Sequence, residues 1–190
     1  MTNALEHIVF SAAAERIHAL YNEEEDALLL AMLGQEYVIR RNGITLRGQK
    51  VPENHEQIIT DYLRSEGAVF IAQPWRSLAE VTSQQNPAFR KTVEGPLAQH
   101  AAECMQRASI IMPLMDAQPV ASAIGSELAF VVRALPKVHL HVELSREDQE
   151  FPAEAWVLFS HNAGDFLKPE SLLLLGEVFR ERLLGLLRIY

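Results

Sequence analysis

Three strand-like runs follow one another in the second half of the chain. They are ELAFVVRAL at 127–135, VHLHVEL at 138–144 and AWVLFSH at 155–161. Parallel neighbours in a sheet need a crossover connection, which is usually a helix. No crossover helix follows each of these runs, so the order of elements predicts an α+β fold with an antiparallel sheet.

The segment 169–188 carries the clearest helical pattern in the chain. Pro169 suits the first turn of a helix, where a backbone N–H has no partner to lose. Apolar residues spaced by three or four then form one continuous stripe, made of Leu172, Leu175, Phe179, Leu183 and Leu186. We expect the 137–144 and 155–161 strands to be antiparallel neighbours and the helix to pack on their apolar face.

Helical patterns also occur earlier in the sequence. We expect helices over 4–21, 53–65 and 95–111. The buried stripe of the second helix should consist of Ile58, Ile59, Tyr62 and Leu63. The third helix should end before Pro113, because proline cannot continue a helix interior.

The remaining segments carry strand and turn signals. Asn42-Gly43 lies between two runs with β-branched residues, and Asn-Gly is the preferred pair for a tight hairpin turn. An antiparallel unit is therefore expected over about 26–48. Residues 68–81 should be extended around Pro74, and residues 113–126 should form a loop.

Length and charge limit the possible functions. The chain has 190 residues and no linker-like segment, which fits one globular domain over 1–190. Its net charge of −8 argues against a nucleic-acid partner, because phosphate binding requires a cationic surface. Cys104 is the only cysteine, so the chain can form no internal disulfide and no cysteine cluster for iron–sulfur or zinc.

Targeting and cofactor motifs do not occur in the sequence. No apolar run approaches the ~20 residues of a membrane helix. The first residues lack the basic cluster of a signal peptide. We therefore expect a cytoplasmic protein without a membrane partner. Neither Gly-x-Gly-x-x-Gly nor a phosphate-loop motif is present, so no nucleotide cofactor is indicated and the cofactor is unknown.

Several short motifs resemble those of a known prokaryotic family. They are WRSLAEV at 75–81, LP at 135–136, DQEFPA at 148–153, VLF at 157–159, NAGDFL at 162–167 and LG at 175–176. From about Tyr37 to the C-terminus, the chain resembles the family called domain of unknown function 3786. The resemblance implies a setting in anaerobic one-carbon or corrinoid–iron–sulfur metabolism, but no particular reaction. Some members are joined to iron–sulfur domains, whereas this chain, with one cysteine, carries no cluster of its own.

His139, His141 and Glu143 alternate along a predicted strand, so their side chains should point to the same face. Two imidazoles and a carboxylate are ligands that zinc and iron accept. The alternative is a strand with one polar face, because the residues between them are all apolar. We favour this alternative and predict that His139 and His141 do not bind a metal ion together.

Asp148 and Glu150 follow the same strand. Two carboxylates held close together can act as an acid and a base. A turn is the simpler interpretation, in which Asp148 accepts backbone N–H bonds and Pro152 directs the chain into the next strand. If Phe151 enters the core, Glu150 should be at least partly buried and hydrogen-bonded.

Two further pairs of residues could bind a ligand. His161 and Asn162 follow a predicted strand, where a rigid sheet can hold polar groups in place. Trp75 can stack on a flat ligand, and Arg76 can pair with a carboxylate. For His161 and Asn162, a structural role in a turn that leads into a helix is equally open. For Trp75 and Arg76, a structural role is more common, with the indole in the core and the guanidinium in solvent.

The leading hypothesis is an accessory protein that binds a small molecule or a protein partner. Its ligand-binding candidates are Trp75, Arg76, Asp148, Glu150, His161 and Asn162. One alternative is an enzyme, such as a hydrolase or lyase, that uses a metal or a pair of carboxylates. Another is a structural module that only forms a homodimer.

Overall fold

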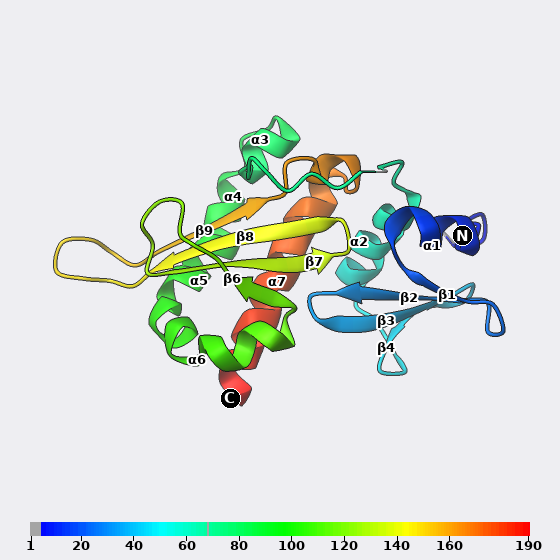
Figure 1. Ribbon diagram of the computed structural model, residues 1–190, viewed down its shortest axis with the longest axis horizontal. Helices are drawn as coiled ribbons and strands as arrows, with labels where there is room; N and C mark the ends of the chain where they lie inside the picture. Colours follow the sequence, from blue (N-terminus) through cyan, green and yellow to red (C-terminus); the bar gives the residue numbers. More distant parts are fainter. Residues whose placement is uncertain (1–4, 68) are drawn as a thin grey trace.

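The strands form two antiparallel sheets in the computed structural model, which describes residues 5–67 and 69–190 (Figure 1). The second sheet has the strand order β6-β7-β8-β9. Its strands are β6 (Ala117–Pro119), β7 (Leu128–Leu135), β8 (Val138–Ser145) and β9 (Glu154–Phe159). The α+β fold is therefore confirmed, as is the antiparallel pairing of the strands expected at 137–144 and 155–161.

The first sheet is the antiparallel unit expected near residues 26–48. Its strands are β1 (Leu20–Asn22), β2 (Ala27–Met32), β3 (Gln35–Arg40), β4 (Gly43–Leu46) and β5 (Gln49–Lys50), paired in that order. The hairpin at Asn42-Gly43 is confirmed, but Arg40 pairs with Gly43, so the two turn residues are Arg41 and Asn42. Gly43 has a φ of 143°, a conformation that glycine adopts more easily than other residues.

The helices lie mainly between and after the sheets. They are α1 (Phe10–Ile17), α2 (Glu53–Arg64), α3 (Leu78–Thr82), α4 (Pro87–Phe89), α5 (Gly95–Gln99), α6 (Ala101–Leu114) and α7 (Pro169–Ile189). A π-helical segment covers Arg90–Glu94, and a short 3-10 helix covers Ala163–Asp165. The expected helix over 53–65 and its buried stripe are confirmed. No helix within the described residues combines the length and the apolar character needed to cross a membrane.

Two of the helices expected from the sequence differ in extent from the prediction. The helix expected over 4–21 begins at Phe10 and ends at Ile17, followed by His18 with a φ of 57°. Residue 4 lies outside the described residues. The helix expected over 95–111 is interrupted at His100 and then continues through Pro113 to Leu114. Pro113 is tolerated because the carbonyl that loses its hydrogen bond belongs to Ser109, on the exposed side of the helix.

The extended segment around Pro74 is shorter than expected. Residue 68 lies outside the described part of the chain, and α3 already begins at Leu78. Ser77 and Glu80 form a capping box at its start, with Ser77 N–H donating to Glu80 Oε2 over 2.7 Å. This Ser-x-x-Glu signal was present in the sequence and was missed. The loop expected over 113–126 also contains the short strand β6.

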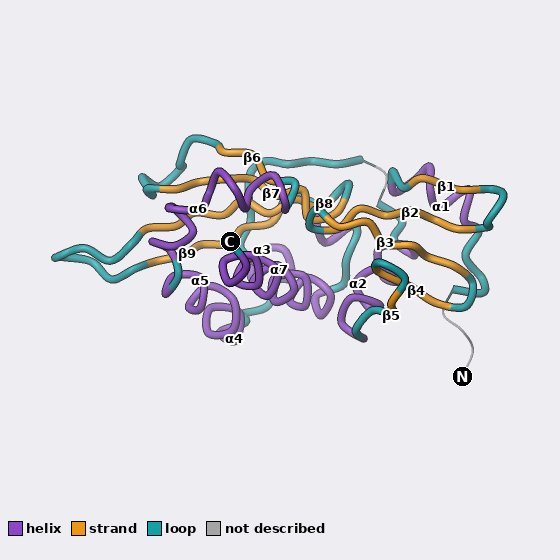
Figure 2. Tube along the Cα trace, turned by 90° about the horizontal axis from the view of Figure 1, so that it is seen from below, coloured by secondary structure: helices purple, strands orange, loops and turns teal. Residues whose placement is uncertain are grey.

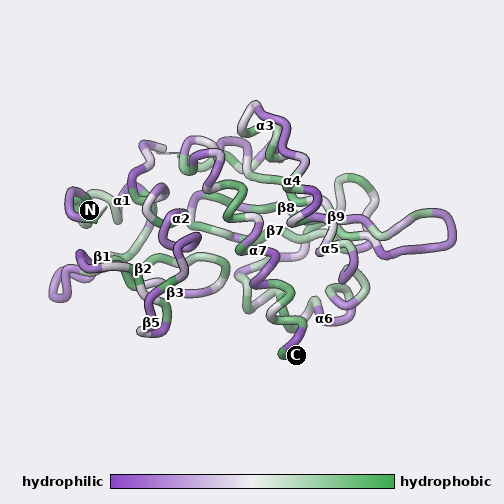
Figure 3. Tube along the Cα trace, turned by 180° about the vertical axis from the view of Figure 1, so that it is seen from behind, coloured by the Kyte–Doolittle hydropathy of each residue, from purple (hydrophilic) through white to green (hydrophobic). Residues whose placement is uncertain are grey.

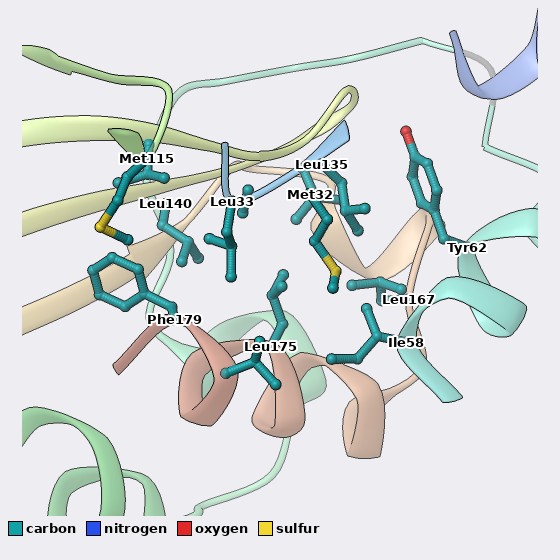
Figure 4. Close-up of a cluster of buried hydrophobic side chains, with 14 of the residues drawn as sticks. Met32, Leu33, Ile58, Tyr62, Met115, Leu135, Leu140, Leu167, Leu175 and Phe179 are labelled. Carbon is teal, nitrogen blue, oxygen red and sulfur yellow. The ribbon is translucent and has the colours of Figure 1, made fainter. Parts of the chain in front are cut away.

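The long helix α7 carries the core on one side of the second sheet. Leu175, Phe179 and Leu183 are fully buried, as the apolar stripe predicted. Figure 4 shows Phe179 beside Leu140 of β8, so the helix packs against the apolar face of that strand. It also packs on α2. Figure 3 shows a predominantly hydrophobic β7, in contrast to the hydrophilic connection between β8 and β9.

The two sheets meet where the β2–β3 turn approaches β7. Leu33 N–H donates a 3.0 Å hydrogen bond to the carbonyl of Ala134. Gly34 follows with a φ of 71°, and a Cβ placed on it would lie 2.3 Å from the carbonyl oxygen of Leu114. Glycine is therefore required here both by its conformation and by the close approach of α6. The buried side chains of both sheets join in one hydrophobic cluster.

Candidate ligand-binding site

The face of the second sheet that points away from α7 is covered by extended chain. Figure 2 shows α4, α5 and α7 on one side of this sheet and the loop segment that leads to α3 along the other side. The segment is held at its end by Arg76, whose N–H donates to Phe159 O over 2.9 Å and whose carbonyl accepts from Phe159 N–H over 2.7 Å. Alternation along β8 places His139, His141 and Glu143 on this outer face.

A cavity of about 420 Å³ opens between this segment and the sheet. Its floor is a row of three paired residues, Val131 of β7, His141 of β8 and Leu158 of β9. Its rim is formed by residues of two connections, namely Gln73, Pro74, Trp75, Val120, Ala121 and Ala123. We call it the Trp75–His141 cavity. None of the described residues that line it is lysine, arginine, aspartate or glutamate.

His141 is held rigidly at the floor of this cavity. Its Nε2 lies 2.8 Å from Glu143 Oε1, and the two residues are 3% and 1% exposed. The Trp75 indole lies against the imidazole, with ring centroids 5.2 Å apart. Nδ1 of His141 is buried, and no described residue provides it with a hydrogen-bond partner. A buried imidazole that is oriented on one side and unpaired on the other suits the recognition of a ligand.

Glu143 organises the loop that forms the other wall of the cavity. Its Oε2 accepts a 2.5 Å hydrogen bond from the Ser122 hydroxyl, and its Oε1 accepts a 2.7 Å bond from Ala123 N–H. The Ser122 hydroxyl in turn accepts the N–H groups of Ile124 and Ser126. Burial raises the pKa of Glu143, but the bonds from Ser122, His141 and Ala123 outweigh burial and lower this pKa overall. The carboxylate is therefore ionised at neutral pH, and Nε2 of His141 carries the proton that it donates.

His139 occupies a separate environment on the same face. Its ring packs against Phe70 at a centroid distance of 4.2 Å, and burial lowers the pKa of its imidazole. Nε2 of His141 is bonded to Glu143, whereas the His139 ring contacts Phe70. In the part of the chain that the structure describes, no three His, Cys, Asp or Glu side chains come close enough to hold a metal ion.

Metal content tests the prediction about His139 and His141 directly. Protein purified without a polyhistidine tag should contain far less than one equivalent of zinc, nickel, cobalt or iron, because Glu143 occupies His141 Nε2. The measurement is elemental analysis of the wild type, of His139→Ala and of a control, His100→Ala. Metal near one equivalent that disappears only in His139→Ala would show that the prediction is wrong.

Arg76, His161 and Asn162 come together beside a second cavity, of about 500 Å³. Arg76 Nε donates to His161 Nδ1 over 3.3 Å, and its Nη1 pairs with Glu80 at 3.3 Å. Asn162 Oδ1 accepts from Ile71 N–H, and its Nδ2 donates to Val69 O and Asp165 Oδ2. These bonds use both ends of the amide, so Asn162 has a structural role in fastening the extended segment to the sheet.

Asp148 and Glu150 lie far from both cavities, in the connection that projects beyond the second sheet (Figure 1). Asp148 Oδ1 accepts the N–H groups of Glu150 and Phe151, which lower the pKa of its carboxyl group. The turn interpretation is therefore confirmed. The expectation that Glu150 is partly buried was wrong, because Glu150 is exposed and Phe151, which is 66% exposed, does not enter the core.

The sequence indicated some of the cavity but not its second wall. Trp75 and His141 were candidates for separate reasons, and the structure brings them into contact. Ser122 and its loop were assigned no role. A usable signal was available, since a buried carboxylate such as Glu143 requires donors, and a serine-containing loop directly precedes β7.

Comparison with known proteins identifies the family. The model of the family described as "Domain of unknown function (DUF3786)" matches residues 10–182. No curated protein matches the chain, and no solved structure matches it. The match includes the outer face of the second sheet, both connections that form the cavity, and most of α7. The chain therefore belongs to the DUF3786 family.

Proposed function

We propose that this chain is an accessory protein that binds a small molecule in the Trp75–His141 cavity. The observation that carries the proposal is the buried Nδ1 of His141, which has no partner among the described residues. A buried polar atom without a hydrogen bond costs about 1–3 kcal/mol relative to a paired one. A bound molecule that forms a hydrogen bond with Nδ1 would offset part of this cost, which explains why an unpaired polar atom lies beside a cavity.

The composition of the cavity supports the same proposal. Ligand sites are concave and mainly apolar, with a few fixed polar groups that orient the ligand. Here the apolar walls come from Val120, Val131 and Leu158, and the fixed polar group is His141. Trp75 adds an aromatic surface at the rim. The resemblance to the family suggests a setting in anaerobic one-carbon metabolism.

A catalytic role is the second candidate, favoured by the contact between Glu143 and His141. A carboxylate that accepts from one imidazole nitrogen makes the other nitrogen a better proton acceptor, as general-base catalysis requires. Asp148 and Glu150 offer no comparable support, since both are exposed in a solvated turn. Binding is the better-supported proposal because no second reactive group faces His141 among the residues that line the cavity.

Fragment binding tests the proposal. Phenol, indole and benzimidazole should be screened by saturation-transfer NMR, and at least one should bind with a dissociation constant near ~1 mM. Replacing Trp75 by alanine should weaken this binding about tenfold or more, because the indole forms one side of the cavity.

Trp156→Ala provides the matched control for this experiment. Trp156 is also a partly exposed indole on the second sheet, but it does not line the cavity. It should leave fragment affinity unchanged. Binding that is undetectable for all three fragments, or equal in the wild type and Trp75→Ala, would show that the proposed site is wrong.

A further inference from the structure

We infer that the ligand of the Trp75–His141 cavity is a flat, uncharged molecule whose O–H or N–H group donates a hydrogen bond to His141 Nδ1. This inference rests on the proposed function, and it adds the chemical class of the ligand. It follows from three properties of the site: the proton arrangement of the imidazole, the absence of charge on the cavity lining, and the shape of its walls.

The proton arrangement of His141 is set by Glu143. The carboxylate already accepts from the Ser122 hydroxyl and from Ala123 N–H. An ionised carboxylate can only accept, so the 2.8 Å contact with His141 requires the proton to be on Nε2. Nδ1 is buried without a partner among the described residues, and with a single proton on the ring it offers a lone pair that needs a donor. A ligand that offers only acceptors would leave this atom unsatisfied.

The lack of cationic side chains in the cavity lining makes anions unfavourable ligands. Carboxylate and phosphate ligands require arginine, lysine or several N–H donors, and none of the described lining residues is lysine or arginine. The carboxylate of Glu143 lies directly behind His141 and would repel a negative group. The net charge of the whole chain is also negative, at −8.

The walls of the cavity determine the shape of the ligand. The floor is a flat sheet surface formed by Val131, His141 and Leu158, and the Trp75 indole covers the imidazole at 33° to its plane. Gln73 supplies the other polar side chain of the lining. A single aromatic ring or a fused pair fits a volume of about 420 Å³ and would contact apolar side chains over most of its surface.

A pair of probes that differ in one donor tests the inference. 4-Nitrophenol carries a neutral O–H group below its own pKa, whereas 4-nitroanisole has the same ring and no donor. Titrations by absorbance should be performed with the neutral form of 4-nitrophenol. We expect the wild type to bind 4-nitrophenol about tenfold more tightly than 4-nitroanisole, the factor that corresponds to one buried hydrogen bond.

His141→Phe should remove this preference while retaining an aromatic ring against Trp75. In this variant 4-nitrophenol should bind as weakly as 4-nitroanisole, and the affinity for 4-nitroanisole should change little. His100→Phe is the control, because His100 is an exposed histidine that pairs with Glu103 and does not line the cavity. The tenfold preference should persist in the control.

The possible outcomes separate the inference from the proposed function. If both probes bind the wild type equally and neither binds Trp75→Ala, the binding site is correct and the requirement for a donor is overturned. Tighter binding of the nitrophenolate anion than of the neutral form would also overturn it, because His141 would then act as a donor. Failure of both probes to bind would overturn the inference, and failure of the phenol, indole and benzimidazole screen as well would overturn the proposed site.

Discussion

Replacing Phe179 by alanine should lower the free energy of unfolding by about 3–5 kcal/mol. Phe179 has no exposed surface and lies where α7 meets β8, beside Leu140 (Figure 4). Removing the ring eliminates its burial and leaves a cavity that α7 cannot close, because the helix is also fixed against α2. The measurement is equilibrium urea unfolding followed by circular dichroism.

Phe151→Ala provides a matched control for this prediction. The same ring is removed, but from a residue that is 66% exposed in the connection between β8 and β9. The free energy of unfolding should change by less than about 0.5 kcal/mol. If the two variants lose similar stability, α7 does not form the centre of the core as described.

Elements whose pattern repeats over several turns or strands could be predicted from the sequence. The stripe of α7 and the alternation in β8 each fix one buried face, so their packing followed without knowledge of other residues. The stripe of α2 was equally clear. These predictions held because burial of an apolar face determines both the local structure and its orientation.

Segments whose structure depends on distant partners could not be predicted in the same way. The break at His100 and the continuation of α6 through Pro113 are examples, because the exposed position of the Ser109 carbonyl is known only once the helix is placed in the fold. Glu150 was expected near the core because Phe151 is apolar. A single apolar residue is a weak guide, however, since many remain exposed in folded proteins.

The candidate site shows the same division. Alternation placed His139, His141 and Glu143 on one face, and this was correct. Whether that face holds a metal or an oriented imidazole depends on Ser122 and Trp75, which lie 21 and 68 positions away from Glu143 in the chain. Their contacts with the β8 residues arise from the two connections that cover the sheet, and no local pattern encodes that arrangement.

Replacing Glu143 by alanine should lower the free energy of unfolding by about 2–4 kcal/mol. Three donors would lose their acceptor, namely the Ser122 hydroxyl, Ala123 N–H and His141 Nε2–H. Glu143→Gln should cost less, because the amide oxygen can still accept from Ala123 N–H and His141 Nε2–H, and only the acceptor of the Ser122 hydroxyl is lost. Glu150→Ala removes an exposed carboxylate of the same type and should change stability by less than about 0.5 kcal/mol.

The pH dependence of these variants distinguishes the loss of the charge from the loss of volume. The pKa of Glu143 is lower in the folded chain than in the unfolded chain. The stability that its ionised form contributes is therefore fully present above the unfolded pKa of about 4.3, and it is lost as the pH falls through the folded pKa. The difference in unfolding free energy between the wild type and Glu143→Gln should thus be constant from about pH 7 to pH 5.5 and shrink below about pH 4. A difference that grows as the pH falls, or that matches the difference for Glu150→Ala at every pH, would mean that the carboxylate does not hold His141 and the Ser122 loop in place.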